Sequence, residues 1–131
     1  MSNRSRPSDF RQRRITVGKN GMVATSHPQS TLTAINVLQA GGNAVDAAIA
    51  AVAVQCVVEP LSTGLGGDCF AIYCRKGGGE PIALNGSGRA PSEARLSDVV
   101  AQTDGQQIPA FSAHAVTIPG AIDAWCRLVA G

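Results

Sequence analysis

Apolar side chains recur with a helical period in residues 27–42 (HPQSTLTAINVLQAGG). Leu32, Ile35 and Leu38 fall at three-residue steps, which places them on one face of an α-helix. The glycine pair at 41–42 follows, and glycine readily takes the left-handed conformation that ends a helix. The pattern therefore predicts a first helix that stops at this pair.

The next segment, residues 43–60 (NAVDAAIAAVAVQCVVEP), is rich in alanine and valine and predicts a second helix. Asn43 is a favourable N-cap, and Asp46 brings a carboxylate to the third helical position, where it suits the helix dipole. Pro60 marks the end of the helix. Because alanines permit close approach of neighbouring backbones, we expect this helix to be deeply buried.

Shorter apolar runs predict strands. Residues 21–26 (GMVATS) are typical of a short strand, while residues 69–76 (CFAIYCRK) and 81–85 (PIALN) flank the turn GGGE and predict a hairpin. Residues 95–102 (RLSDVVAQ) predict a short helix capped by Ser97.

The end of the chain, residues 114–131 (HAVTIPGAIDAWCRLVAG), predicts a strand, a turn at Pro119-Gly120 and a last helix. So few strands leave sheet edges and one sheet face without partners. The pattern describes an α/β (α+β) fold, and we expect part of that fold to lie outside this chain.

Composition agrees with one small domain, because 44% of the 131 residues are apolar and only 4% are aromatic. The net charge of +2 is unevenly placed. We interpret residues 1–16 as a disordered basic tail rather than a nucleic-acid-binding segment, because Phe10 is the single aromatic residue among its arginines and the rest of the chain is nearly neutral. Those arginines are Arg4, Arg6, Arg11, Arg13 and Arg14.

The first residues lack the apolar core of a signal peptide. The longest apolar run, residues 47–54, is far shorter than the span of about 20 residues that crosses a membrane. We therefore expect a cytoplasmic protein with no membrane or nucleic-acid partner. Four cysteines lack zinc-type spacing, and without a signal peptide they predict buried thiols rather than disulfides: Cys56, Cys69, Cys74 and Cys126.

A glycine-rich run, GLGGDC at 64–69, invites comparison with phosphate-binding loops. It stands after a predicted helix and before a predicted strand, which is the reverse of the dinucleotide-binding order, and Asp68 would repel a phosphate. We interpret its glycines as positions of close backbone packing.

Nucleophile and base candidates are weak. Ser87 lies in NGSG, which lacks the first glycine of a serine elbow. Thr25 and His27 are too close in sequence to face one another. His114 is interpreted as a hydrogen-bonded structural histidine rather than a base. Spacing alone therefore gives no complete catalytic set and no metal site.

Five longer motifs occur in a fixed order: GMVATSHP at 21–28, GGNAVDAAIA at 41–50, VVEPLSTGLGG at 57–67, ALNGSGRAPSEA at 83–94 and AVTIPGAIDAW at 115–125. Together they resemble the large subunit of the gamma-glutamyltranspeptidase (glutathione hydrolase) family, over residues 17–131.

The resemblance implies that residues 17–131 are the N-terminal portion of that large subunit, with a partial αββα sandwich of the N-terminal-nucleophile hydrolase type. The family's precursor cuts itself once, and the new N-terminal Thr of the small subunit attacks a γ-glutamyl amide. Water or an amine then takes the acyl group, and no cofactor or metal is required.

No threonine of this chain stands in the nucleophile motif, so no catalytic residue is expected here and this fragment alone is expected to be inactive. The expected partners are the remainder of the large subunit, the small subunit and a γ-glutamyl or other amide substrate. An acylase reaction on the same scaffold and a non-catalytic interaction module are the alternatives.

One departure from the family concerns substrate binding. The family follows its second hairpin strand with a pattern like L-D-x-R-E-x-A-P, whose arginine binds the α-carboxylate of the glutamyl group. Aligned on Ala90-Pro91, this chain reads L-N-G-S-G-R-A-P, so Ser87 stands at the arginine's position. Arg89 lies two residues later and is the candidate for substrate binding. The departure resembles the transpeptidase-like branch that includes acylases.

Overall fold

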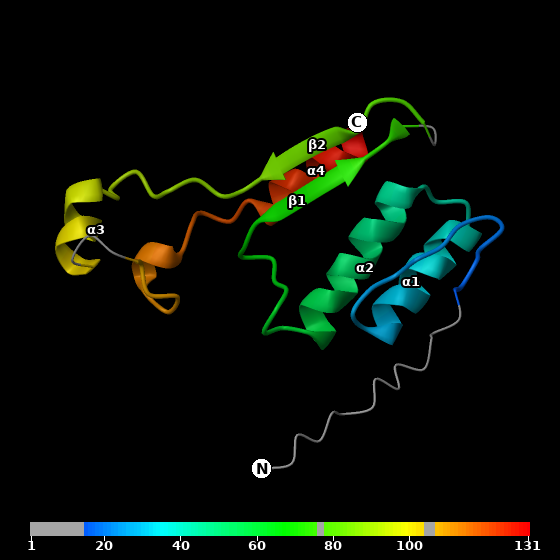
Figure 1. Cartoon of the computed structure of the whole chain (residues 1–131), viewed down its shortest axis with the longest axis horizontal. Coiled ribbons are helices and arrows are strands. Elements are labelled where there is room, and N and C mark those ends of the chain that lie inside the picture. Colours follow the sequence, from blue (N-terminus) through cyan, green and yellow to red (C-terminus); the bar gives the residue numbers. More distant parts are fainter. Residues whose placement is uncertain (1–14, 76–77, 104–106) are drawn as a thin grey trace, which may run out of the picture.

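The structure, a computed structural model, describes residues 15–75, 78–103 and 107–131 and has a mixed α+β arrangement (Figure 1). Residues 1–14 of the predicted tail and Lys76 of the predicted strand 69–76 lie outside the described residues. The elements are α1 (Pro28–Gln39), α2 (Ala44–Val58), β1 (Cys69–Tyr73), β2 (Ile82–Gly86), α3 (Leu96–Thr103), the 3₁₀ helix η2 (Ala113–Ala115) and α4 (Ala121–Ala130).

Helix α1 forms where the sequence predicts it. His27 is the N-cap, and its Nδ1 accepts a hydrogen bond from the backbone N–H of Gln29 at 3.2 Å. Pro28 occupies the first turn, where its missing N–H costs nothing. Beyond the last turn, Gly41 has a φ of 94° and the N–H of Gly42 bonds back into the helix at 2.9 Å. The glycine pair is the predicted left-handed stop.

Helix α2 begins with a capping box. The Oδ1 of Asn43 accepts hydrogen bonds from the N–H groups of Val45 at 2.7 Å and Asp46 at 3.0 Å. The Oδ2 of Asp46 accepts from the N–H of Asn43 at 2.9 Å. These bonds satisfy three N–H groups that the helix itself cannot use, so the predicted roles of both residues are confirmed.

Small side chains hold α1 against α2. The buried contact consists of Ser30 and Ala34 from α1 with Ala47 and Ala51 from α2.

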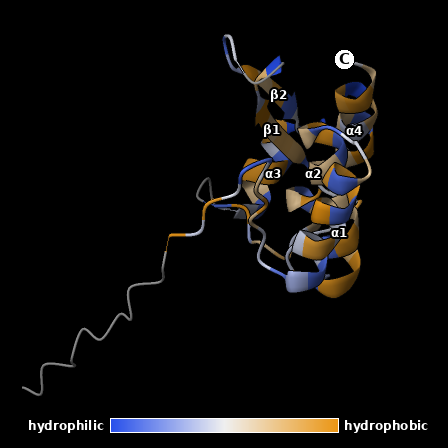
Figure 2. Cartoon of the chain, turned by 90° about the vertical axis from the view of Figure 1, so that its right-hand side faces the viewer, coloured by the Kyte–Doolittle hydropathy of each residue, from blue (hydrophilic) through white to orange (hydrophobic). Residues whose placement is uncertain are grey.

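The expectation that α2 is deeply buried is wrong for the described residues, because Val57 on the same helix is 77% exposed. Figure 2 shows hydrophobic and hydrophilic stretches interleaved along α1 and α2.

The predicted hairpin is confirmed. Strands β1 and β2 pair antiparallel, from Cys69 opposite Gly86 to Tyr73 opposite Ile82. Helix α4 covers one face, where the methyl group of Ala124 lies so close to Gly86 that a side chain at Gly86 would collide with it. The glycine therefore sets the distance between α4 and the sheet.

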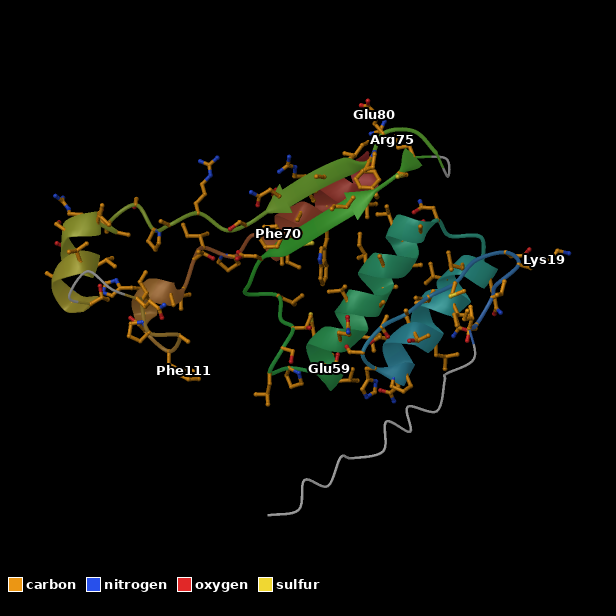
Figure 3. All side chains as sticks on the ribbon, in the orientation of Figure 1. Lys19, Glu59, Phe70, Arg75, Glu80 and Phe111 are labelled. Carbon is orange, nitrogen blue, oxygen red and sulfur yellow. The ribbon has the colours of Figure 1, made fainter. Side chains whose placement is uncertain are left out.

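The other face of the hairpin is open. Because side chains alternate along a strand, Phe70 and Ile72 point away from α4. They are 69% and 78% exposed, and Figure 3 shows the Phe70 ring on the open side. Within the described residues nothing covers this apolar face.

Two predicted strands are wrong. Residues 21–26 form no strand, and within the described residues none of their backbone groups makes a backbone hydrogen bond. Residues 114–118 instead begin in η2, whose N-cap is Ser112, and then continue as irregular chain. A strand needs a neighbouring strand for its ladder, and β1 and β2 pair only with each other in this part of the structure.

Helix α3 also differs from its prediction in one detail. Ser97 lies inside the helix rather than before it, and its Oγ contacts Oδ1 of Asp98 at 3.1 Å. Among the described residues, no helix is both long and apolar enough to cross a membrane.

Glu59 fixes the chain that leaves α2. Its Oε2 accepts hydrogen bonds from Ser26 Oγ at 2.5 Å and from Gln55 Nε2 at 3.0 Å. Its carbonyl oxygen accepts from the N–H groups of Ser62 and Thr63, each at 3.0 Å. The bond from Ser26 is the main cause that lowers the pKa of Glu59 below its ordinary value of 4.5. One residue thus ties the start of α1 to the loop that follows α2.

Asn43→Ala should destabilise the chain by about 1 kcal/mol, because the capping bonds to the first turn of α2 are lost. Urea denaturation of the full chain measures the change. Asn36→Ala is the matched control, since Asn36 is exposed inside α1 and alanine is favourable there. An equal loss in both variants would contradict the capping role.

Glu59→Gln should weaken the pH dependence of the free energy of unfolding in the acidic range. A lowered folded-state pKa means that ionised Glu59 stabilises the fold above its ordinary pKa, and this contribution disappears as pH falls through the lower value. The wild type and variant should therefore differ most near neutral pH and converge in urea titrations as the pH falls below the lowered pKa of Glu59. Glu93→Gln, at an exposed loop residue, should keep the wild-type slope.

Candidate functional site

Three segments of chain meet at one end of the hairpin, beside the first turn of α4. They are residues 64–68, 86–89 and 117–121, which we call the three-loop junction. The carbonyl of Gly67 accepts hydrogen bonds from the N–H groups of Gly120 and Ala121, each at 3.0 Å. The N–H of Ile118 donates to the carbonyl of Arg89 at 2.9 Å. Main-chain bonds therefore hold the junction together.

Asp68 adds the one side chain that joins all three segments. Its Oδ1 accepts a hydrogen bond from the N–H of Gly88 at 2.7 Å and one from Thr117 Oγ1 at 3.3 Å. Sequence reasoning weighed Asp68 only as a group that would repel phosphate. Its place between a glycine run and a strand was the available signal.

Close packing requires glycine at Gly88 and Gly120, which lie outside the glycine-rich run at 64–67. A side chain at Gly88 would collide with the carbonyl of Ile118, and one at Gly120 would lie 2.5 Å from the carbonyl of Gly86. By contrast, a side chain at Gly64 or Gly66 would meet nothing within 4 Å. The predicted packing role of the glycines in 64–67 is therefore wrong within the described residues, and the need for bare backbone lies at the junction.

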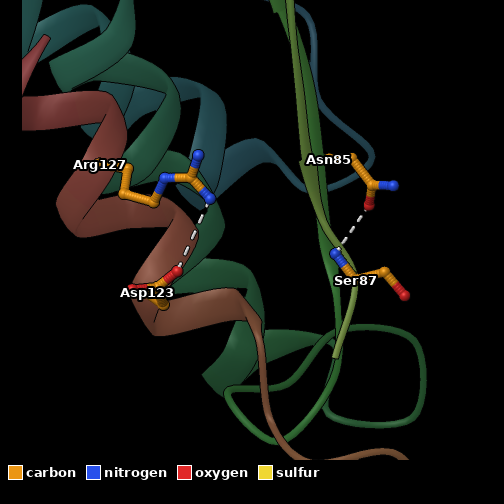
Figure 4. A network of polar contacts seen from close by, with 4 residues as sticks. All are labelled: Asn85, Ser87, Asp123 and Arg127. Carbon is orange, nitrogen blue, oxygen red and sulfur yellow. Dashed lines mark hydrogen bonds and ion pairs between the residues drawn. The ribbon is translucent and has the colours of Figure 1, made fainter. Parts of the chain in front are cut away.

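Ser87, the weak nucleophile candidate, and Arg89, the candidate for substrate binding, flank Gly88. Ser87 follows β2, and its N–H donates to Oδ1 of Asn85 at 3.0 Å, which turns the chain at the strand end (Figure 4). The Ser87 side chain in this view points away from α4. Both Ser87 and Arg89 are exposed. Within the described residues the one ion pair joins Arg127 and Asp123 at 3.9 Å. No carboxylate of these residues therefore forms an ion pair with the Arg89 guanidinium.

The other histidine and hydroxyl candidates serve local structure. Thr25 Oγ1 donates to the carbonyl of His27 at 2.8 Å, and the His27 ring caps α1, so the two do not form a nucleophile–base pair. His114 Nε2 lies 2.7 Å from Gln102 Oε1, which agrees with a hydrogen-bonded structural histidine.

The four cysteines are free thiols, and only Cys56 and Cys69 are partly buried, so the expectation of buried thiols is wrong for Cys74 and Cys126, which are exposed. Within the described ranges, no group of three or more His, Cys, Asp or Glu side chains is placed to hold a metal ion.

Comparison with known proteins places the chain. Residues 30–130 match the profile of the gamma-glutamyltranspeptidase family. The chain is 32% identical to the acylase ACY 1 proenzyme of Pseudomonas sp. (strain SE83), over 95% of this chain and 24% of that protein. It is 35% identical to the glutathione hydrolase proenzyme of Bacillus subtilis (strain 168), over 86% and 21% respectively. The chain thus spans about a quarter of these relatives' length.

Solved structures agree. The cephalosporin acylase from Bacillus halodurans is 42% identical with a TM-score of 0.81, covering 98% of this chain and 24% of that one. The Helicobacter pylori gamma-glutamyltranspeptidase is 30% identical with a TM-score of 0.75, covering 88% and 34%. These likenesses confirm the predicted α+β fold class of the N-terminal-nucleophile hydrolase type. By sequence and by fold, the chain belongs to the gamma-glutamyltranspeptidase family.

Proposed function

We propose that residues 17–131 are the N-terminal portion of an enzyme that cleaves γ-glutamyl amides and transfers the acyl group to water or an amine. Family membership carries the proposal, and relatives named glutathione hydrolase and gamma-glutamyltranspeptidase support it. Because the chain spans about a quarter of the curated relatives' length, the reaction belongs to a larger protein.

The nucleophile is assigned to a threonine outside this chain. Several hydroxyl groups of the described threonines already bond locally: Thr25 with Thr31 at 2.7 Å, Thr103 with the carbonyl of Val99 at 2.7 Å and Thr117 with Asp68. A Thr that becomes N-terminal after self-cleavage carries its own α-amino group as a base. Neither a metal nor an organic cofactor has a part in this scheme, and this chain alone is inactive in it.

The partners in this proposal are the remainder of the large subunit and the small subunit. Phe70 and Ile72 give the hairpin an apolar face that a second sheet of a sandwich would bury. From residue 22 to residue 26, exposed and partly buried side chains alternate. The unpaired backbone groups of these residues would gain ladder bonds from a strand of the larger protein. Relatives described as proenzymes support a processed partner subunit.

Arg89 is the proposed ligand of the substrate's α-carboxylate. It is exposed and lacks a carboxylate partner in the described part of the chain, so a substrate carboxylate would be its first ion pair. It emerges from backbone that Ile118 and Asp68 hold on either side of it.

Acylase activity is the second candidate. Ser87 stands where the family pattern carries its carboxylate-binding arginine, and a serine hydroxyl cannot supply the charge of a guanidinium. The 42% identity to a cephalosporin acylase favours the same alternative. The two candidates differ in whether the acyl group carries an α-carboxylate and amine.

The first test is to follow the reading frame past Gly131 and to express the whole product. We expect mass spectrometry to find two chains, the second beginning with Thr, and we expect the purified product to release p-nitroaniline from a γ-glutamyl anilide. Faster cleavage of an aliphatic acyl anilide would select the acylase candidate. A single uncleaved chain that cleaves neither anilide would contradict both and leave the interaction module.

Arg89→Ala in the processed enzyme should raise KM for the γ-glutamyl anilide by about ten- to hundredfold, as the loss of a charge-assisted carboxylate contact would do. Steady-state kinetics measures the change. Arg95→Ala is the matched control, because Arg95 is exposed and precedes α3. An unchanged KM in Arg89→Ala would remove the residue from the substrate site.

A further inference from the structure

The loop that carries Ser87 and Arg89 has little side-chain packing to hold it. Both residues are exposed, and Gly88 between them has no side chain. A larger residue at Gly88 is excluded by the carbonyl of Ile118, so the loop passes this point as bare backbone. Its conformation therefore depends on main-chain hydrogen bonds, and glycine makes the unbonded loop especially free to move.

Two hydrogen bonds fix this backbone from opposite sides of the Gly88–Arg89 pair. The N–H of Ile118 holds the carbonyl of Arg89 at 2.9 Å. The Oδ1 of Asp68 holds the N–H of Gly88 at 2.7 Å, which is the distance of a strong, charge-assisted bond. The first bond does not engage the peptide between Ser87 and Gly88. Within the described residues the bond to Asp68 is the one hydrogen bond made by that peptide, which also lies close to the backbone of Gly120.

Thr117 sets the position of the Asp68 carboxylate. Its hydroxyl donates to the same Oδ1 at 3.3 Å, from a residue 49 positions along the chain. Asp68 itself directly follows Gly67, whose carbonyl is fixed by the N–H groups of Gly120 and Ala121. The acceptor is thus anchored on both its backbone and its side chain, while the group that it restrains belongs to a glycine.

We propose that Asp68 is a positioning residue for the substrate site: by holding the N–H of Gly88, it fixes the direction in which Arg89 meets the substrate. The inference rests on the proposed function, because it takes Arg89 as the substrate's ligand. Without the bond to Asp68, the loop would become ordered only when substrate binds. The conformational entropy lost in that ordering would weaken substrate binding. The chemical step, carried by groups outside this chain, would change less.

The first experiment needs no catalysis. Amide hydrogen exchange of Gly88, followed by NMR in the full 131-residue chain, should accelerate about five- to tenfold in Asp68→Ala, as loss of one hydrogen bond permits local opening. Asp68→Asn keeps an acceptor oxygen and should restore most of the protection. Asp98→Ala removes a carboxylate whose hydrogen-bond partner is the neighbouring Ser97 and should leave Gly88 unchanged. If Asp68→Ala does not fold, Asp68→Glu takes its place. Its longer side chain displaces the carboxylate, so the exchange of the Gly88 amide should accelerate in the same way.

The second experiment uses the processed enzyme with whichever anilide it cleaves best. Asp68→Ala should raise KM about three- to tenfold with a smaller change in kcat, and Asp68→Asn should recover most of the loss. Unchanged Gly88 exchange in Asp68→Ala overturns the proposal even if the enzyme cleaves γ-glutamyl amides. Faster exchange without a rise in KM reduces Asp68 to a structural residue and also overturns it. Failure to cleave γ-glutamyl amides rejects the proposed substrate, whereas the exchange result and the KM for the alternative anilide still decide the role of Asp68.

Discussion

The close approach of main chain to main chain at the three-loop junction is the contact on which the second half of the structure depends. Gly67 accepts two hydrogen bonds from the first turn of α4, and Gly120 and Gly88 allow the neighbouring segments to come within reach. Without that approach α4 would not lie on the hairpin, because the contact at Gly86 has no room for a side chain. Small residues thus determine where the larger elements lie.

The same preference for small residues governs the first half and explains its exposed apolar surface. Alanine and serine form the α1–α2 contact, so the helices approach closely but bury little apolar area. Large side chains such as Val57, Phe70 and Ile72 remain exposed, on faces that the described residues do not cover. The chain covers 24% of the acylase ACY 1 proenzyme, and under the proposed function these faces would contact the remainder of the larger protein.

Local sequence signals predicted the elements whose stabilising bonds are local. Asn43 and Asp46 cap α2 within four residues, and β1 and β2 are consecutive strands that pair antiparallel. Residues 21–26 and 114–118 have the composition of strands but remain without a ladder, because a strand is defined by a partner that no local pattern supplies. Asp68 was missed for the same reason, since its two hydrogen-bond partners lie 20 and 49 residues away.

The candidate site shows how one scaffold can keep its fold while its substrate changes. The junction holds the backbone at Gly88 and Arg89 mainly through glycines, a carboxylate and main-chain groups, to which Ser87 Oγ adds a hydrogen bond to the Gly88 carbonyl at 3.4 Å. Those two side chains project from the fixed backbone into solvent. Under the proposed function, a serine in place of the family's arginine at position 87 and a cation at position 89 would cost little folding free energy, because both positions are exposed. Selection for a new acyl group would then act on residues that the fold does not need.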